Sequence, residues 1–112
     1  MMYNVNGVDL EADEQGYLLE PVFDDEAVRV IAAAEQITLT DAHWEVINYL
    51  RDQYKQEGAT PNLRNLIKGL QTDGDMPEAD SKLLFELFPD GGAAKQGCKI
   101  AGLPQPRGKA GY

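Results

Sequence analysis

Cys98 is the only cysteine in the 112 residues, so every thiol reaction of this chain depends on it. Lys95 and Lys99 lie within one helical turn of it, and neighbouring ammonium groups favour the reactive thiolate form of a cysteine. The residue types and their spacing therefore allow a sulfur-accepting or redox-active thiol. In this interpretation Cys98 is the candidate catalytic residue, and the two lysines are the neighbours that favour its thiolate.

A second interpretation of Cys98 is structural. Small residues recur at spacings that place them with the thiol on one face of a helix: Ala94, Gly97, Cys98 and Ala101. Such a face lets a helix pack closely, and free cysteine is among the most buried residue types. Both interpretations stay open on the sequence alone, and the exposure of the Cys98 sulfur in the folded protein decides between them.

The other side chains that could do chemistry predict no further site. The single histidine, His43, stands beside Trp44 at the start of an apolar helical face, which indicates a packed ring with a hydrogen bond. Pairing of His43 with Cys98 is chemically possible, but nothing in their spacing supports it. Capping and solvation account for four acids at an expected helix boundary: Asp73, Asp75, Glu78 and Asp80. A zinc site needs three or four cysteine or histidine ligands, so we expect no metal and no cofactor.

The net charge of −9 is unevenly distributed along the chain. Residues 1–90 hold all 19 acids and six of the ten bases, whereas residues 91–112 hold four bases and no acid. An acidic body disfavours nucleic acid and anionic lipid as partners. No apolar run approaches the roughly 20 residues of a membrane helix, no secretory signal is evident, and one cysteine cannot form an internal disulfide. These features predict a cytoplasmic protein; they leave its oligomeric state open.

Hydrophobic periodicity predicts an α+β, mostly helical fold. The pair Asn6-Gly7 between alternating apolar residues predicts a small N-terminal β-hairpin or meander, because both turn positions need positive φ. About five helices follow. They are expected after a cap at Asp24, over 41–57, over 61–71, from Pro77 to Phe88, and over about 93–101. The expected inner faces of the first two helices are Ala27, Val30, Ile31 and Ala34, then His43, Val46, Ile47, Leu50 and Tyr54.

The helices at 41–57 and 61–71, joined by three residues, have the outline of a helix-turn-helix pair. The second of them presents polar residues away from its apolar face: Asn62, Arg64, Asn65, Lys68 and Gln71. Two bases in an acidic body supply few phosphate contacts, and such contacts carry most of the affinity for DNA. A DNA-binding regulator is therefore the last of three functional hypotheses.

Four segments of the chain carry a resemblance to a known family: 13–18, 39–51, 59–68 and 87–106. The last contains the run Lys95-Gln96-Gly97-Cys98-Lys99-Ile100-Ala101-Gly102-Leu103-Pro104, which is its most specific part. Over nearly its whole length the chain resembles the DsrC/TusE family, also called the gamma subunit of dissimilatory sulfite reductase. We expect one domain over 1–102 and a flexible C-terminal arm over 103–112.

The resemblance implies a small sulfur-relay protein. It implies partners of the TusBCD or DsrEFH sulfurtransferase kind, and either sulfite reductase or a tRNA-thiolating enzyme as the receiver of sulfur. Members act as carriers within such a relay rather than as enzymes on their own. The residues that the resemblance assigns to the partner-binding arm are Leu103, Pro104, Pro106, Arg107 and Lys109.

The resemblance also identifies a departure at the end of the chain. Cys98 matches an upstream cysteine of the family, whereas Lys109 stands eleven positions later, where the sulfur-accepting cysteine is expected. A lysine ammonium cannot form a persulfide. The first hypothesis is therefore a relay protein that docks through its arm, with sulfur carriage at most residual through Cys98. The alternative is a non-catalytic interaction or regulatory paralogue that senses sulfur or redox state through Cys98.

Overall fold

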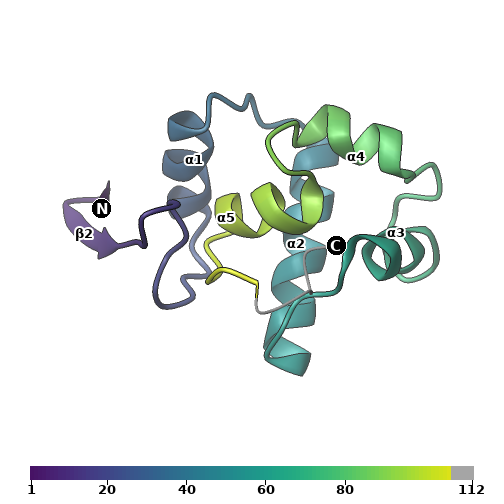
Figure 1. Ribbon diagram of the computed structural model, residues 1–112, viewed down its shortest axis with the longest axis horizontal. Helices are drawn as coiled ribbons and strands as arrows, with labels where there is room; N and C mark the ends of the chain where they lie inside the picture. Colours follow the sequence, from purple (N-terminus) through teal and green to yellow (C-terminus); the bar gives the residue numbers. More distant parts are fainter. Residues whose placement is uncertain (107–112) are drawn as a thin grey trace.

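The computed structural model describes residues 1–106, and residues 107–112 lie outside the described part of the chain. A small β-hairpin lies at one end of a helical body (Figure 1). In chain order the elements are β1 (Met2–Val5), β2 (Val8–Glu11), α1 (Asp25–Ala34), α2 (Asp41–Glu57), α3 (Leu63–Thr72), α4 (Ser81–Leu87), a π-helical turn η1 (Ala93–Gly97) and α5 (Cys98–Ile100). The predicted fold class, a mostly helical α+β protein that begins with a hairpin, is confirmed.

The hairpin forms at the turn that the sequence predicted. β1 and β2 pair antiparallel, and the two turn residues Asn6 and Gly7 have φ angles of 53° and 83°. Alternation along β1 directs Tyr3 and Val5 into the core, where each is about nineteen-twentieths buried. The hairpin is thus anchored to the body by one face of β1, which packs against α1.

Helix α1 begins at the predicted cap, but its buried face differs from the predicted one. The side chain of Asp24 accepts a hydrogen bond from the backbone N–H of Glu26. Val28 and Ala32 are buried, whereas Val30 is only half-buried and Ala34 is exposed. The reason is that α1 is covered on two sides, by β1 and by α5. The two contacts together turn the buried face away from Val30 and Ala34.

Helix α2 has the predicted bounds. Thr40 caps it together with His43 in a reciprocal capping box, and Gly58 ends it in the left-handed conformation with a φ of 71°. Its buried face holds the predicted residues apart from Tyr54, which is half-buried. Arg51 is buried as well and pairs with Asp25 in the first turn of α1, with 2.7 Å between nitrogen and oxygen.

Helices α3 and α4 begin later than predicted. Asn62, not Thr60, caps α3 by accepting a hydrogen bond from the N–H of Asn65. Asp80 caps α4 in the same way from Leu83, so that Pro77 lies outside the helix. In both cases an Asn or Asp side chain caps the helix by accepting a hydrogen bond from the backbone N–H three residues later. This capping outweighs the preference of proline for the first helical position.

The η1 turn and α5 form the centre of the helical body. Figure 1 shows α5 between α1 and α2, and η1 contacts α2, α3 and α4. Ala93, Cys98 and Ile100 have no exposed surface. The sequence predicted one regular helix over about 93–101, but its first turn is π-helical, with a wider ring and more residues in each turn.

A backbone contact at Gly102 fixes the exit from this central segment. Gly102 has a φ of 81°, and its carbonyl oxygen accepts a hydrogen bond of 2.9 Å from the N–H of Val22. A Cβ atom at this position would lie 2.5 Å from the carbonyl oxygen of Val22. Leu103, which we expected on the arm, has no exposed surface and its N–H donates to the carbonyl of Cys98. The burial of its side chain therefore continues the core one residue past Gly102.

In residues 1–106, no helix is both long enough and apolar enough to span a bilayer.

Replacing Gly102 with alanine tests this contact. Gly102→Ala combines an unfavourable left-handed φ with a collision on the Val22 oxygen, and we expect the free energy of unfolding to fall by roughly 3 kcal/mol. Gly7→Ala is the matched control, because Gly7 has a φ of 83° and nothing within 4 Å of an added Cβ. It should cost only about 1 kcal/mol. If urea unfolding shows that the two variants lose equal amounts of unfolding free energy, the contact with Val22 is unimportant.

Candidate functional site

The thiol of Cys98 lies inside the core. The residue has no exposed surface, and its Sγ donates a hydrogen bond of 3.4 Å to Oγ1 of Thr60. Burial raises the pKa of the Cys98 thiol to about 11, and the hydrogen bond with Thr60 lowers it by a smaller amount. The group is therefore a neutral thiol near pH 7, as the structural interpretation of the sequence predicted.

The two lysines that flank Cys98 lie in different surroundings. The ammonium of Lys99 lies 3.3 Å from Oε1 of Glu35 and 5.3 Å from the centre of the Tyr17 ring. The backbone carbonyl of Lys95, a half-buried residue, accepts a hydrogen bond of 3.3 Å from the Tyr17 hydroxyl. The charge of Lys99 is thus paired with a carboxylate in the structure.

A polar cluster that no sequence pattern predicted surrounds this ion pair. Gln96 donates from Nε2 to Oε1 of Glu35 over 3.1 Å, and its Oε1 accepts from the N–H of Asp90 over 3.0 Å. Burial, followed by repulsion from the Cys98 thiolate, raises the pKa of Tyr17 to about 12. Glu35 and Gln96 are 61 residues apart in the chain, and a local sequence pattern cannot predict a contact between residues so far apart.

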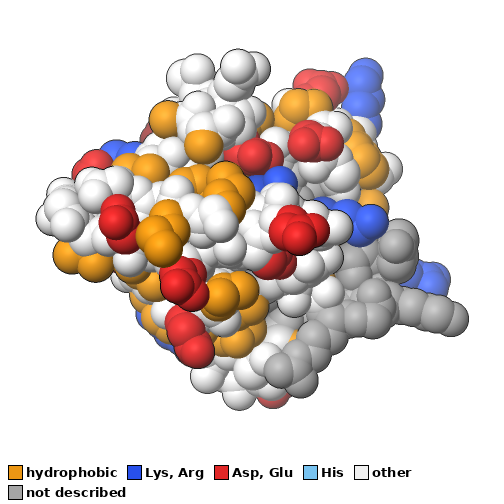
Figure 2. Space-filling view, turned by 60° about the vertical axis from the view of Figure 1, so that its left-hand side comes forward, with side chains coloured by type: hydrophobic (Ala, Val, Ile, Leu, Met, Phe, Trp, Pro, Cys, Tyr) orange, Lys and Arg blue, Asp and Glu red, His pale blue; other side chains and the backbone are white. Residues whose placement is uncertain are grey.

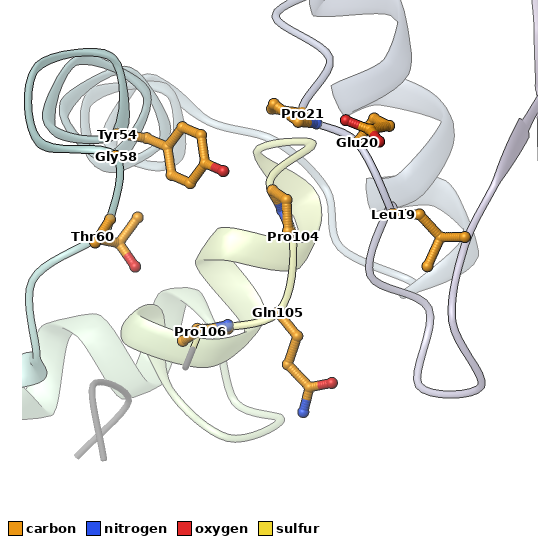
Figure 3. Close-up of a pocket in the computed structure, with 10 residues that line it drawn as sticks. Leu19, Glu20, Pro21, Tyr54, Gly58, Thr60, Pro104, Gln105 and Pro106 are labelled. Atoms are coloured by element: carbon orange, nitrogen blue, oxygen red, sulfur yellow. The ribbon is translucent and has the colours of Figure 1, made fainter. Parts of the chain in front are cut away.

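A cleft of about 470 Å³ has Thr60, the hydrogen-bond partner of the thiol, in its wall (Figure 3). Its walls come from three separate segments: Leu19, Glu20 and Pro21; Tyr54, Gly58, Ala59 and Thr60; and Pro104, Gln105 and Pro106. In Figure 3 the segment 104–106 runs between the other two. Thr60 both lines the cleft and accepts the hydrogen bond of Cys98, so this one side chain links the cleft wall to the buried thiol.

The residues predicted for the arm lie in different surroundings in the structure. Leu103 is in the core, whereas Pro104 and Pro106 line the cleft. Gln105 is exposed and donates from Nε2 to Oε1 of Gln15. Arg107 and Lys109 lie outside the described residues.

His43 is a packed histidine, as its position predicted. Its ring meets the ring of Phe88 edge-on, with 5.2 Å between centroids. One ring nitrogen lies 2.8 Å from the Thr40 hydroxyl and the other 2.8 Å from the Leu87 carbonyl oxygen. Both ring nitrogens therefore have partners other than Cys98. Within residues 1–106, no three carboxylate, histidine or cysteine side chains gather to hold a metal ion.

Comparison with known proteins gives this geometry a family context. A sequence model described as DsrC like protein matches residues 4–109. The sulfurtransferase TusE homolog of Haemophilus influenzae is 44% identical over 94% of this chain and 96% of its own. Sulfurtransferase TusE of Photorhabdus laumondii is 41% identical, and the match covers 95% of this chain and 96% of that protein.

Solved structures agree with these sequence matches. The oxidized gamma-subunit of the dissimilatory sulfite reductase (DsrC) from Archaeoglobus fulgidus has a TM-score of 0.86 and 35% identity, and the match covers 96% of this chain and 98% of that one. The NMR structure of Allochromatium vinosum DsrC has a TM-score of 0.83 and 37% identity over the same shares. The chain described here is therefore a member of the DsrC/TusE family of sulfur-relay proteins.

Proposed function

We propose that this member docks on its relay partners through the C-terminal segment and carries sulfur at most residually, through Cys98. The burial of the Cys98 thiol is the single observation that carries the proposal. A sulfur carrier must present a thiolate to a donor, but this thiol is enclosed and its pKa is raised to about 11. Docking needs no free thiol, and it uses the segment that begins with Pro104 in the cleft wall.

The residual chemistry is a persulfide exchange. A thiolate of Cys98 attacks the outer sulfur of a partner persulfide, a new sulfur–sulfur bond forms at Cys98, and the partner's sulfur–sulfur bond breaks to leave its thiolate. No external oxidant or reductant is needed, because one sulfur–sulfur bond replaces another. The step requires the Cys98 thiol both to lose its proton and to leave its enclosure beside Thr60.

The docking segment of this proposal begins at Pro104, since Leu103 belongs to the core. Pro104 and Pro106 fix φ near −65° and limit the backbone conformations of the segment 104–106, which lines the cleft. Arg107 and Lys109 add two positive charges in the continuing sequence. We assign this segment to a sulfurtransferase of the TusBCD or DsrEFH kind, or to sulfite reductase, which are the partners that the family implies.

The burial of the thiol also supports the second candidate, an interaction or regulatory paralogue. In that role Cys98 reports a sulfur or redox signal only when the domain opens, and the protein never transfers sulfur. The two candidates share the docking segment and differ in the fate of Cys98 once a persulfide donor is present.

Alkylation of Cys98 tests how far the fold protects it. At pH 8 a rise in pKa from 9.0 to about 11 lowers the thiolate fraction about 100-fold. We therefore expect iodoacetamide to react with the folded protein at least about 100-fold more slowly than with the urea-unfolded chain. Between pH 8 and 10 the rate for the folded protein should rise about tenfold for each pH unit, whereas the rate for the unfolded chain levels off above pH 9.

A control variant isolates the contribution of Thr60. Thr60→Val removes the hydroxyl that can donate a hydrogen bond to the Cys98 thiolate and so lowers the pKa of the thiol. Alkylation should therefore become slower still, while the rate for the unfolded chain stays the same. Rapid labelling of the folded wild-type protein at pH 8 would contradict the proposal, because it would mean that Cys98 is accessible as a thiolate.

The docking segment is tested by removing its charges. Arg107→Ala combined with Lys109→Ala should weaken binding to a purified TusBCD-type complex about tenfold in surface plasmon resonance, mainly through faster dissociation. Arg64→Ala combined with Lys68→Ala is the matched control, because it removes two exposed bases from α3 and should change the dissociation constant less than about twofold. Equal losses in the two double variants would argue against a docking role for the segment.

A further inference from the structure

The first 28 residues of the chain, which include the hairpin, carry only acidic side-chain charge. Residues 1–28 contain no lysine or arginine, and the first base of the chain is Arg29. The same stretch holds eight acids: Asp9, Glu11, Asp13, Glu14, Glu20, Asp24, Asp25 and Glu26. Like charges gathered on one face create a negative potential that attracts cationic partners and repels anionic ones.

Exposed apolar side chains accompany these acids. Met2, Val8 and Leu19 expose 57%, 59% and 52% of their surfaces. Figure 2 turns this side of the molecule forward, and hydrophobic and acidic side chains are interleaved across it. Single exposed apolar residues are common on proteins, so a docking site also requires a hollow in the surface beside them.

A hollow of about 280 Å³ lies on this face, between β2 and the segment 18–22. Its lining residues are Asp9, Leu10, Glu11, Leu18, Leu19, Glu20 and Val22. Four of these residues are aliphatic, and the other three are the exposed acids Asp9, Glu11 and Glu20. The segment is held in place by a backbone bridge between Ala12 and Leu18 and by the bond from Val22 to Gly102.

Leu19 and Glu20 line this hollow and also the cleft that contains Thr60. We call the hollow between β2 and the segment 18–22 the hairpin groove.

We propose that the hairpin groove binds a segment of a partner protein in which aliphatic side chains alternate with lysine or arginine. The aliphatic residues of the lining contact the apolar side chains, and the exposed acids Asp9, Glu11 and Glu20 attract the bases. The chain's own residues 107–112 fit less well. They supply Arg107 and Lys109, but their other members are two glycines, an alanine and a terminal tyrosine, with no aliphatic side chain larger than alanine.

This inference rests on the fold and on charge, and it needs neither Cys98 nor the docking segment. A partner can therefore contact the molecule at two places, and loss of one leaves the other. Failure at the groove would not refute the proposed relay function, and failure of the relay would leave the groove intact.

The test uses the full chain and a synthetic peptide, acetyl-LKVRLKV-amide, with its acidic twin acetyl-LEVDLEV-amide. Fluorescence anisotropy should show that the basic peptide binds and that the acidic twin does not. Raising salt from about 0.05 M to 0.5 M should weaken binding at least about threefold, because the rim charges are exposed. In an amide correlation spectrum of the wild-type protein, the peptide should shift signals at 9–11 and 18–22.

Leu19→Ser combined with Glu20→Gln should raise the dissociation constant about tenfold. Phe85→Ser combined with Glu86→Gln is the matched control, because it also changes an exposed apolar residue followed by an exposed acid, here on α4. That control should leave the dissociation constant within about twofold of the wild-type value. Both variants should have the same urea unfolding midpoint as the wild-type protein. If one of them is destabilised, the spectrum of the wild-type protein with the peptide still maps the site.

Three outcomes would overturn the proposal. The first is equal binding of the acidic twin, and the second is a set of shifted amides that lies outside the groove. The third concerns the chain's own end: if Arg107→Gln with Lys109→Gln tightens peptide binding about tenfold or more, the occupant of the groove is this chain's terminus and not a partner.

Discussion

The burial of the segment from Ala93 to Leu103 is the constraint on which the rest of the structure depends. All four longer helices pack against it, α1 through α5 and α2 to α4 through η1. Close packing requires small residues there, and a Cβ added to Gly97 would lie only 3.1 Å from a methyl carbon of Leu50. The same packing encloses the only thiol, so the property that makes this domain compact also makes its sulfur chemistry difficult.

Burying this segment also buries polar groups, and the fold compensates each of them. The carboxylate of Glu35 receives both the amide of Gln96 and the ammonium of Lys99. The Lys99 and Glu35 side chains are only 13% and 17% exposed, so loss of either partner would leave a poorly solvated charge. The ring of Tyr17 covers this pair, and the N-terminal part of the chain is thereby tied to the last helix.

Local signals made the hairpin and α2 predictable from the sequence. Asn6-Gly7 and the caps at Thr40 and Gly58 act over a few residues, and the structure has all of them. The later starts of α3 and α4 were missed because the cap residue competes with a nearby proline. The π-helical turn was missed because such turns are rare, and a short apolar helical segment predicts the common α-helix instead.

The burial of Leu103 and the polar cluster around Glu35 follow from contacts that are distant in sequence. Leu103 looked like the first residue of an arm because it precedes Pro104, but its position is set by Gly102 and the distant Val22. The candidate site was therefore predictable as a cysteine on a face of small residues. Thr60, which connects Cys98 to the cleft, lies 38 residues earlier in the chain, so this connection depends on the tertiary fold.

We propose that the folded domain protects the Cys98 thiol from accepting sulfur. Intact-mass spectrometry after incubation with a low-molecular-weight persulfide, at pH 7 and with Cys98→Ser as the control, tests it directly. We predict that the folded protein gains almost no sulfur, whereas the same chain in urea gains one atom that the variant does not. Stoichiometric gain of one sulfur atom by the folded protein, lost in Cys98→Ser, would contradict the account.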